Sequence, residues 1–144
     1  MAITITKTEV KRKCVIASGD TTYDSDIDSL IAEMQPSIEY TIADCYYGDT
    51  GNTKLQATLK LGILEIISGE FLEQLCRELG ATEEMSVGSI NIGERKERGQ
   101  ALILQGAARL APFLKSMQPS QGETVVQSTT SSDDRTFNLS ETVW

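Results

Sequence analysis

The sequence predicts a mainly α protein: a small helical bundle that carries a short β-hairpin and an extended C-terminal arm. Apolar residues recur at three- and four-residue steps through most of the first 116 residues, a spacing typical of amphipathic helices. A glycine-punctuated β segment, EEMSVGSINIGE, interrupts this pattern at residues 83–94. From Gln118 onward the chain is rich in Ser, Thr and Gln and poor in core-forming residues. We therefore expect an N-terminal extended arm (residues 1–22), a helical domain (residues 23–116, with the hairpin near 85–93) and a C-terminal arm (residues 117–144).

The composition fits one domain and excludes several kinds of catalytic site. The chain has 144 residues and no histidine, so Ser-His triads, His-ligated zinc and His-based acid–base catalysis are excluded. P-loop and dinucleotide fingerprints are also missing from the sequence. We predict no enzyme activity, no cofactor and no bound metal. The three cysteines form no CxxC pair, which favours a reducing compartment over a disulfide framework.

Acidic residues are concentrated early in the chain. The formal net charge is −8, and between Cys14 and Thr53 there are acidic residues but no lysine or arginine. Such a surface repels a phosphate backbone, which argues against a domain that grips DNA. An ordinary solvated acidic face is the simpler interpretation.

The first 22 residues are expected to be extended. Ile3 and Ile5 alternate with Thr4 and Thr6, as in a short β strand or extended arm. Several basic residues follow, and they either contact an acidic partner or supply ordinary solubilising charge. These residues are Lys7, Lys11, Arg12 and Lys13.

Two long helices are expected next. The first covers about residues 24–45, with acidic residues in its first turn where they favour the helix dipole. Pro36 interrupts its apolar stripe without changing the phase, which predicts one kinked helix and not two helices. The second helix covers Thr53–Leu79. Gly62 and Gly69 lie on one side of it, which indicates close approach of another helix, from the same fold or from a second subunit. Simple looseness of the helix at Ser68–Gly69 is the alternative.

The β segment is expected to form a very small hairpin. Its apolar and polar residues alternate, with a phase slip at Gly88–Ser89 that predicts a tight turn or bulge. A hairpin of this size is unstable alone in water, so it must lie on the helical body or on a neighbouring chain. The candidate interface residues are Met85, Val87, Ile90 and Ile92.

A charged link and a third helix complete the predicted domain. Residues 94–99 mix acidic and basic side chains and are expected to form a solvated link. The third helix covers about Gln100–Ser116, with Pro112 bending its last turn. Its expected inward residues are Leu102, Ile103, Gly106, Ala107, Leu110 and Leu114.

The C-terminal arm has too little apolar surface to order itself. It nevertheless carries spaced apolar residues, including the only tryptophan of the chain. We interpret it as an arm that orders on a partner, by strand addition or by filling surface pockets, in preference to an unstructured tail. The candidate partner-binding residues are Val125, Val126, Phe137, Leu139, Val143 and Trp144.

Four segments of the chain, taken in order, resemble one viral family. They are YDSDIDSLIAEMQPSIEYTIADCYYG (23–48), SGEFLEQLCRELG (68–80), SVGSINIGE (86–94) and GAARLAPFLK (106–115). Their order and spacing resemble those of the head-to-tail connector proteins of tailed bacteriophages, also called adaptor or head-completion proteins. The resemblance covers most of residues 23–115 and leaves out both arms, and Pro36 is less usual in the first helix of the family.

The resemblance implies a structural virion protein that forms a homo-oligomeric ring, a dodecamer, beneath the portal protein. Such a ring extends the DNA channel and provides the docking platform for the next neck or tail-completion protein. Genomic DNA is expected to pass through without sequence-specific binding. The protein is expected in the host cytoplasm during assembly and then in the neck of the virion, with no membrane contact. The alternatives are another neck or tail-completion protein of different stoichiometry, or a cytosolic module whose acidic surface binds a basic partner.

Overall fold

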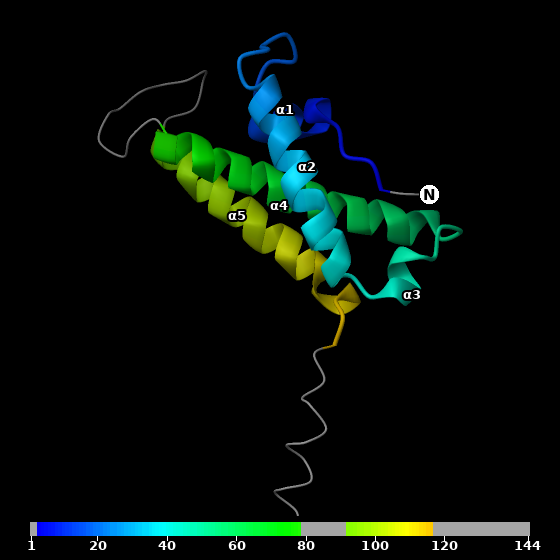
Figure 1. Ribbon diagram of the computed structural model, residues 1–144. Helices are drawn as coiled ribbons and strands as arrows, with labels where there is room; N and C mark the ends of the chain where they lie inside the picture. Colours follow the sequence, from blue (N-terminus) through cyan, green and yellow to red (C-terminus); the bar gives the residue numbers. More distant parts are fainter. Residues whose placement is uncertain (1–2, 79–91, 117–144) are drawn as a thin grey trace, which may run out of the picture.

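A computed structural model of the chain describes residues 3–78 and 92–116 (Figure 1). Within these ranges the protein is mainly α, as predicted, with five helices, a short 3-10 turn and no strand. The predicted hairpin residues Met85, Val87 and Ile90 lie outside these ranges. In chain order the elements are α1 (Lys7–Cys14), α2 (Asp24–Thr41), α3 (Asp44–Tyr47), α4 (Thr53–Glu78), α5 (Ile92–Leu110) and η1 (Ala111–Phe113).

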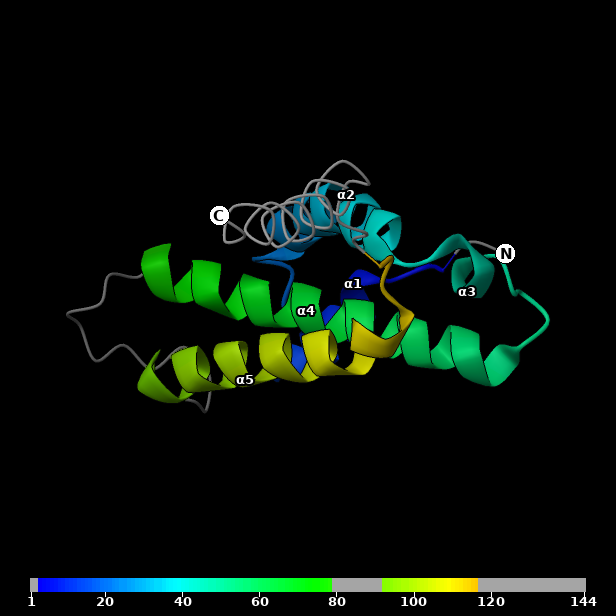
Figure 2. The ribbon, with the colours of Figure 1, turned by 90° about the horizontal axis from the view of Figure 1, so that it is seen from below.

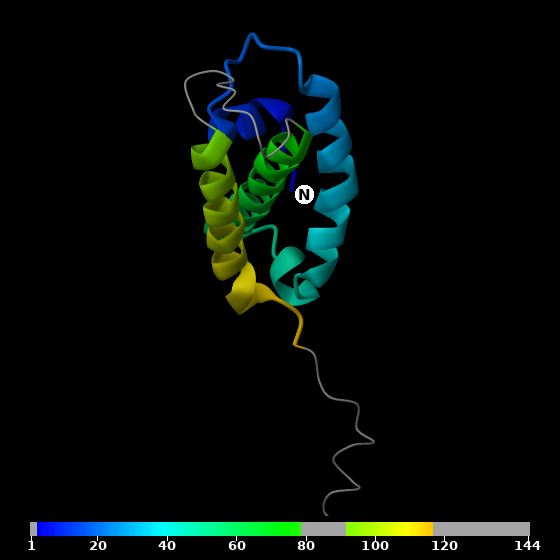
Figure 3. The same cartoon turned by 90° about the vertical axis from the view of Figure 1, so that its left-hand side faces the viewer.

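The central element of the fold is α4, which has almost the bounds that the sequence predicts. Asn52 caps its start, because the Asn52 side-chain oxygen accepts a hydrogen bond from the Leu55 N–H at 3.1 Å. α5 and α2 pack on opposite sides of α4, and α1 also packs on α4, next to both of them (Figures 1 and 2). Seen along the bundle, α2 and α5 form the two outer walls (Figure 3). The fully buried apolar residues of α4 are Leu59, Ile63, Ile67 and Leu72.

Glycines set the distance between the antiparallel helices α4 and α5. Gly62 faces Gly106, and Gly69 faces Gly99. A Cβ atom added at Gly69 would lie 2.5 Å from the carbonyl oxygen of Gly99, and one added at Gly106 would lie 2.6 Å from that of Gly62. The two backbones therefore touch where a side chain would hold them apart. This confirms that Gly62 and Gly69 face a closely packed helix, and the helix belongs to the same chain.

The N-terminal segment is not the extended arm that the sequence predicts. Residues 3–6 belong to no helix or strand, with Thr6 extended, and a helix begins at Lys7. Thr6 and Glu9 form a capping box, in which the Thr6 hydroxyl accepts the Glu9 N–H at 3.4 Å and the Glu9 carboxylate accepts the Thr6 N–H at 3.0 Å. The segment is part of the core because its apolar residues are buried, namely Ile3, Ile5, Val10 and Cys14.

α1 ends at a strained residue. Val15 has φ 59° and ψ 41°, and its N–H turns back toward the carbonyl groups of Arg12 and Lys11. Ile16 adds a second bond, from its N–H to the Lys11 carbonyl at 2.9 Å. Glycine is the usual residue at such a left-handed helix end, since the Cβ atom of other residues crowds the backbone.

We expect Val15→Gly to raise the free energy of unfolding by about 0.5–1 kcal/mol. Relief of roughly 1–2 kcal/mol of backbone strain is partly offset by the greater freedom of glycine in the unfolded chain. Urea-induced unfolding measures the change. Val15→Ala keeps a Cβ atom and is the matched control, so an equal gain from both variants would show that the strain is not the cause.

α2 differs from the predicted helix at its C-terminal end. It passes through Pro36 without ending, as predicted, but it stops at Thr41 and not near Cys45. Ile42 is extended and fully buried. Ile42 pairs with Leu114 in an isolated antiparallel bridge, so a long-range contact replaces the next helical turn.

α5 begins earlier than the predicted third helix. The prediction of a strand at Ile92 is wrong, because Ile92 is helical. Residues 94–99 are not a link but part of the same helix, although Lys96, Glu97 and Arg98 are exposed to solvent as predicted. Charges of opposite sign at helical spacing favour a helix there, and Gly99 is buried against α4 and does not break it. Of the expected inward residues, Ala107 and Leu114 are exposed. Those that are buried are Leu102, Gly106 and Leu110.

Candidate assembly surfaces

The interface residues that the sequence predicts fall almost entirely outside the part of the chain that the structure describes. Ile92 is the exception, and it is the first residue of α5. The hairpin residues outside are Met85, Val87 and Ile90. The arm residues outside are Val125, Val126, Phe137, Leu139, Val143 and Trp144. The surfaces below are built from residues that sequence reasoning did not single out as interface residues.

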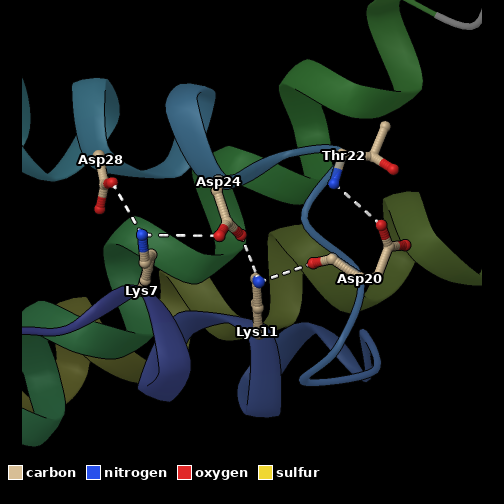
Figure 4. A network of polar contacts seen from close by, with 6 residues as sticks. All are labelled: Lys7, Lys11, Asp20, Thr22, Asp24 and Asp28. Carbon is tan, nitrogen blue, oxygen red and sulfur yellow. Dashed lines mark hydrogen bonds and ion pairs between the residues drawn. The ribbon is translucent and has the colours of Figure 1, made fainter.

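A network of polar contacts joins α1 to the start of α2 (Figure 4). Lys11 is only 3% exposed; it forms an ion pair with Asp24 and donates a hydrogen bond to the backbone carbonyl of Asp20 at 2.6 Å. The Lys7 ammonium lies 3.5 Å from the Asp24 carboxylate and 3.4 Å from that of Asp28. For these two lysines, the expected acidic partner is therefore the chain's own acidic helix.

The same contacts shift the titration of the groups involved. Hydrogen bonding from Lys11, together with the charges of Lys11 and Lys7, holds the pKa of Asp24 below its ordinary value of 3.8. The hydrogen bond and the charge of Asp28 raise the pKa of Lys7 above 10.5. The Asp24 carboxylate and the Lys7 ammonium are therefore both charged throughout the neutral pH range, and their ion pair between α1 and α2 persists.

Acid should weaken this junction through Asp24. The pKa of Asp24 is lower in the folded chain than in the unfolded chain, so its pairing stabilises the fold above about pH 4 and is lost as the pH falls through the folded value. We expect Asp24→Asn to lower the urea midpoint at pH 7 and to have a diminishing effect between pH 4 and pH 2. Asp26→Asn is the matched control, since the described residues provide Asp26 with no ion pair. A difference between Asp24→Asn and wild type that stays constant over this range would contradict the assignment.

A buried carboxylate lies where α1, α4 and α5 meet. Glu65 of α4 is 1% exposed. Arg109 of α5 binds it with two hydrogen bonds, from Nε to Oε2 at 3.0 Å and from Nη2 to Oε1 at 3.2 Å. The Lys13 ammonium of α1 lies 3.6 Å from Oε1. This paired fork geometry fixes how α5 sits on α4. The signal that could have revealed Glu65 is its place inside the apolar run GILEIIS.

The end of the described domain is fastened to the junction between α2 and α3. The Ala43 N–H donates to the Phe113 carbonyl at 2.8 Å, and the Lys115 N–H donates to the Thr41 carbonyl at 2.8 Å. The Lys115 ammonium also lies 4.4 Å from the centroid of the Tyr40 ring. These contacts fix the point from which the C-terminal arm starts.

The outer face of α5, formed by Ala101, Leu104, Ala107 and Ala108, is apolar and uncovered by other described elements. Leu104 is 71% exposed and the three alanines are exposed around it. α2 forms the opposite wall of the bundle and carries Tyr40, which is 77% exposed (Figure 3). Contiguous apolar surface is typical of sites that bind another protein. Of the two walls, only α5 groups apolar side chains in this way, and the exposed Gln100 and Gln105 stand among them.

Within residues 3–78 and 92–116 there is no group of three or more side chains suited to hold a metal ion. In the same ranges, no helix combines the length and the apolar character needed to cross a membrane. The chain matches no family model, no characterised protein and no solved structure.

Proposed function

We propose that this chain is a head-to-tail adaptor of a tailed bacteriophage, a structural virion protein that acts by assembly and not by bond chemistry. Copies form a ring, a dodecamer, beneath the portal protein. The ring extends the DNA channel and provides the docking platform for a neck or tail-completion protein. The protein passes from the host cytoplasm to the neck of the virion as assembly proceeds.

The observation that carries the proposal is the order of the four family-like segments along the chain. The first segment forms α2 and α3, the second lies at the end of α4, and the fourth forms the end of α5 together with η1. These elements pack around one core, which contains residues from α1, α2, α4 and α5. The segments that carry the resemblance thus belong to one structural unit, as a small ring subunit requires.

The two outer walls of the bundle also support a ring. A ring subunit needs two different surfaces on opposite sides, because each copy contacts its neighbours head to tail. Here α5 presents an apolar wall, and α2 presents a wall with exposed acids such as Asp26 and Glu33. Acids of α2 that lie at the channel edge of this contact would repel the DNA phosphates and let the genome slide.

Truncation after Met117 tests the proposal. We expect the truncated chain to fold, because the core of the described domain lies within residues 3–116, and to fail to join heads that contain portal protein. Circular dichroism measures folding, and electron microscopy of mixed heads measures attachment. The matched control is a full-length chain with Phe137→Ser, Leu139→Ser and Trp144→Ser, which keeps the length of the tail and removes its apolar side chains. It should also fold and fail to join heads.

Attachment that is unimpaired in both variants would remove the arm from the proposal. Twelvefold rings in electron micrographs are the expected result for the adaptor. Sixfold rings would favour another neck or tail-completion protein. A monomer tightly bound to a host protein outside virions would favour the cytosolic module and overturn the proposal.

A further inference from the structure

A groove of about 410 Å³ lies between the N-terminal segment and the first turns of α4. Ile3 and Thr4 line one side of it, and Thr53, Ala57 and Lys60 line the other. The α4 residues recur at three- and four-residue steps, so they form one continuous helix face. Thr53 and Ala57 are exposed, which leaves this wall open to an incoming chain.

One side of the groove is a short segment, residues 3–6, with unused backbone groups. It belongs to no helix or strand, and its last residue, Thr6, is extended. The Thr6 N–H is taken up by the capping box, and the Ile3 carbonyl accepts a hydrogen bond from Gln35. The N–H and carbonyl groups of Thr4 and Ile5 have no hydrogen bond among the residues that the structure describes. Thr4 is exposed, so its backbone edge is accessible to another extended segment.

The other side of the groove includes one lysine, Lys60. The Lys60 side chain is 38% exposed and lies 2.7 Å from Glu9, so its charge is shared with that carboxylate. Lys54 is exposed at the same end of α4 and has no ion pair among the described residues. A groove with open backbone groups on one side, Lys60 in its wall and Lys54 beside it at the same end of α4 suits an extended acidic peptide with apolar side chains at alternate positions.

We propose that this groove receives residues 133–144 of a second copy of the chain. This segment, DDRTFNLSETVW, has three acids and one arginine, so its charge complements the lysines. Phe137 and Leu139 are two residues apart and would point to the same side of a strand added along Thr4 and Ile5. The inference deepens the proposed function and rests on it, because a ring places copies side by side.

The chain between the domain and this segment is long enough to reach a neighbouring copy. Residues 117–132 can span up to about 55 Å when extended. By comparison, the 26 residues of α4 form a helix about 39 Å long. The tail of one copy can therefore pass the length of the domain and reach the groove of the next.

Two full-length variants test the proposal with a fluorescent, C-terminally amidated peptide of residues 133–144. The receptor is Phe137→Ser/Leu139→Ser, whose own tail is disabled. Adding Ala57→Glu to it places a bulky carboxylate in the groove and should weaken peptide binding at least about tenfold. Ala17→Glu, at an exposed position in the loop between α1 and α2, should leave binding within about twofold. A peptide that carries the two serine substitutions should not bind. Equal binding by the Ala57→Glu and Ala17→Glu receptors, or by both peptides, would overturn the proposal.

Mixing separates a second copy from the chain's own tail. Full-length Ala57→Glu has an intact tail and a blocked groove, and Phe137→Ser/Leu139→Ser has the reverse. Light scattering should show each variant alone as a monomer and the mixture as a one-to-one complex. The opposite result has two parts: the mixture forms no complex, and the wild type is a monomer that does not bind the fluorescent peptide. Together they would show that the groove holds the tail of its own chain, and the proposal would be overturned. If the complex forms but the protein does not attach to heads, this inference stands and the proposed function falls. If attachment to heads is unaffected by Ala57→Glu, the proposed function stands and this inference falls.

Discussion

Gly69→Ala should destabilise the protein by about 2–3 kcal/mol, although alanine is the better helix former by about 1 kcal/mol. The added Cβ atom would lie 2.5 Å from the Gly99 carbonyl oxygen and 2.9 Å from the Ile103 backbone nitrogen. Both neighbours are backbone atoms, so no change of rotamer can relieve the clash and α5 must move away from α4. Chemical denaturation measures the loss as a lower midpoint.

Gly19→Ala is the matched control for this prediction. A Cβ atom at Gly19 would meet no atom within 4 Å, so this variant should stay within about 0.5 kcal/mol of wild type. Gly106→Ala should repeat the effect of Gly69→Ala, since its Cβ atom would lie 2.6 Å from the Gly62 carbonyl oxygen. A wild-type midpoint for Gly69→Ala would show that the two helices are not held at backbone contact.

Arg109→Met should cost about 3 kcal/mol of unfolding free energy. It removes both hydrogen bonds to Glu65, whose side chain is 2% exposed, and leaves a buried carboxylate without its main partner. This loss is at the lower end of the range of about 3–5 kcal/mol for breaking a buried ion pair. The reasons are that the Arg109 side chain is 32% exposed and that Lys13 remains 3.6 Å from the carboxylate. Urea unfolding at neutral pH measures the loss.

The double variant Glu65→Met/Arg109→Met should recover most of that stability, because it removes the uncompensated charge along with its partner. Arg77→Met is the matched control, since Arg77 is 65% exposed and pairs with Glu70 near the surface. That pair should contribute no more than about 1 kcal/mol. Equal losses for Arg109→Met and Arg77→Met would contradict a burial penalty at Glu65.

The parts of the fold that the sequence predicts well are those that depend on local periodicity. α2 and α4 follow the apolar stripes of the sequence. The stripe of α2 keeps its phase through Pro36, so the sequence predicts the continuous helix that the structure has there. The close packing at the α4 glycines was also predictable. Gly62 and Gly69 each weaken the helix, and the close approach of another backbone compensates this cost. Only the identity of the facing helix required the structure.

The parts that the sequence predicts poorly depend on contacts between distant residues. α1 has eight residues, and its start depends on the Thr6–Glu9 capping box, which the alternation of Ile3 and Ile5 concealed. The end of α2 depends on pairing with Leu114, far along the chain. The ion pairs of Lys11 and of Glu65 join helices whose relative placement no periodicity shows. The candidate groove likewise forms only when residues 3–4 lie against α4.

The pairing of residues 41–43 with residues 113–115 determines how the domain would respond to a mechanical pull. Tension on the chain beyond Ser116 is transmitted at once to the end of α2 through the Thr41 and Ala43 hydrogen bonds, as well as to η1 and α5. The load is shared by helices from both halves of the sequence, and α5 is not the first element to fray. A domain held in this way resists a pull on its C-terminal end without being unfolded from that end first.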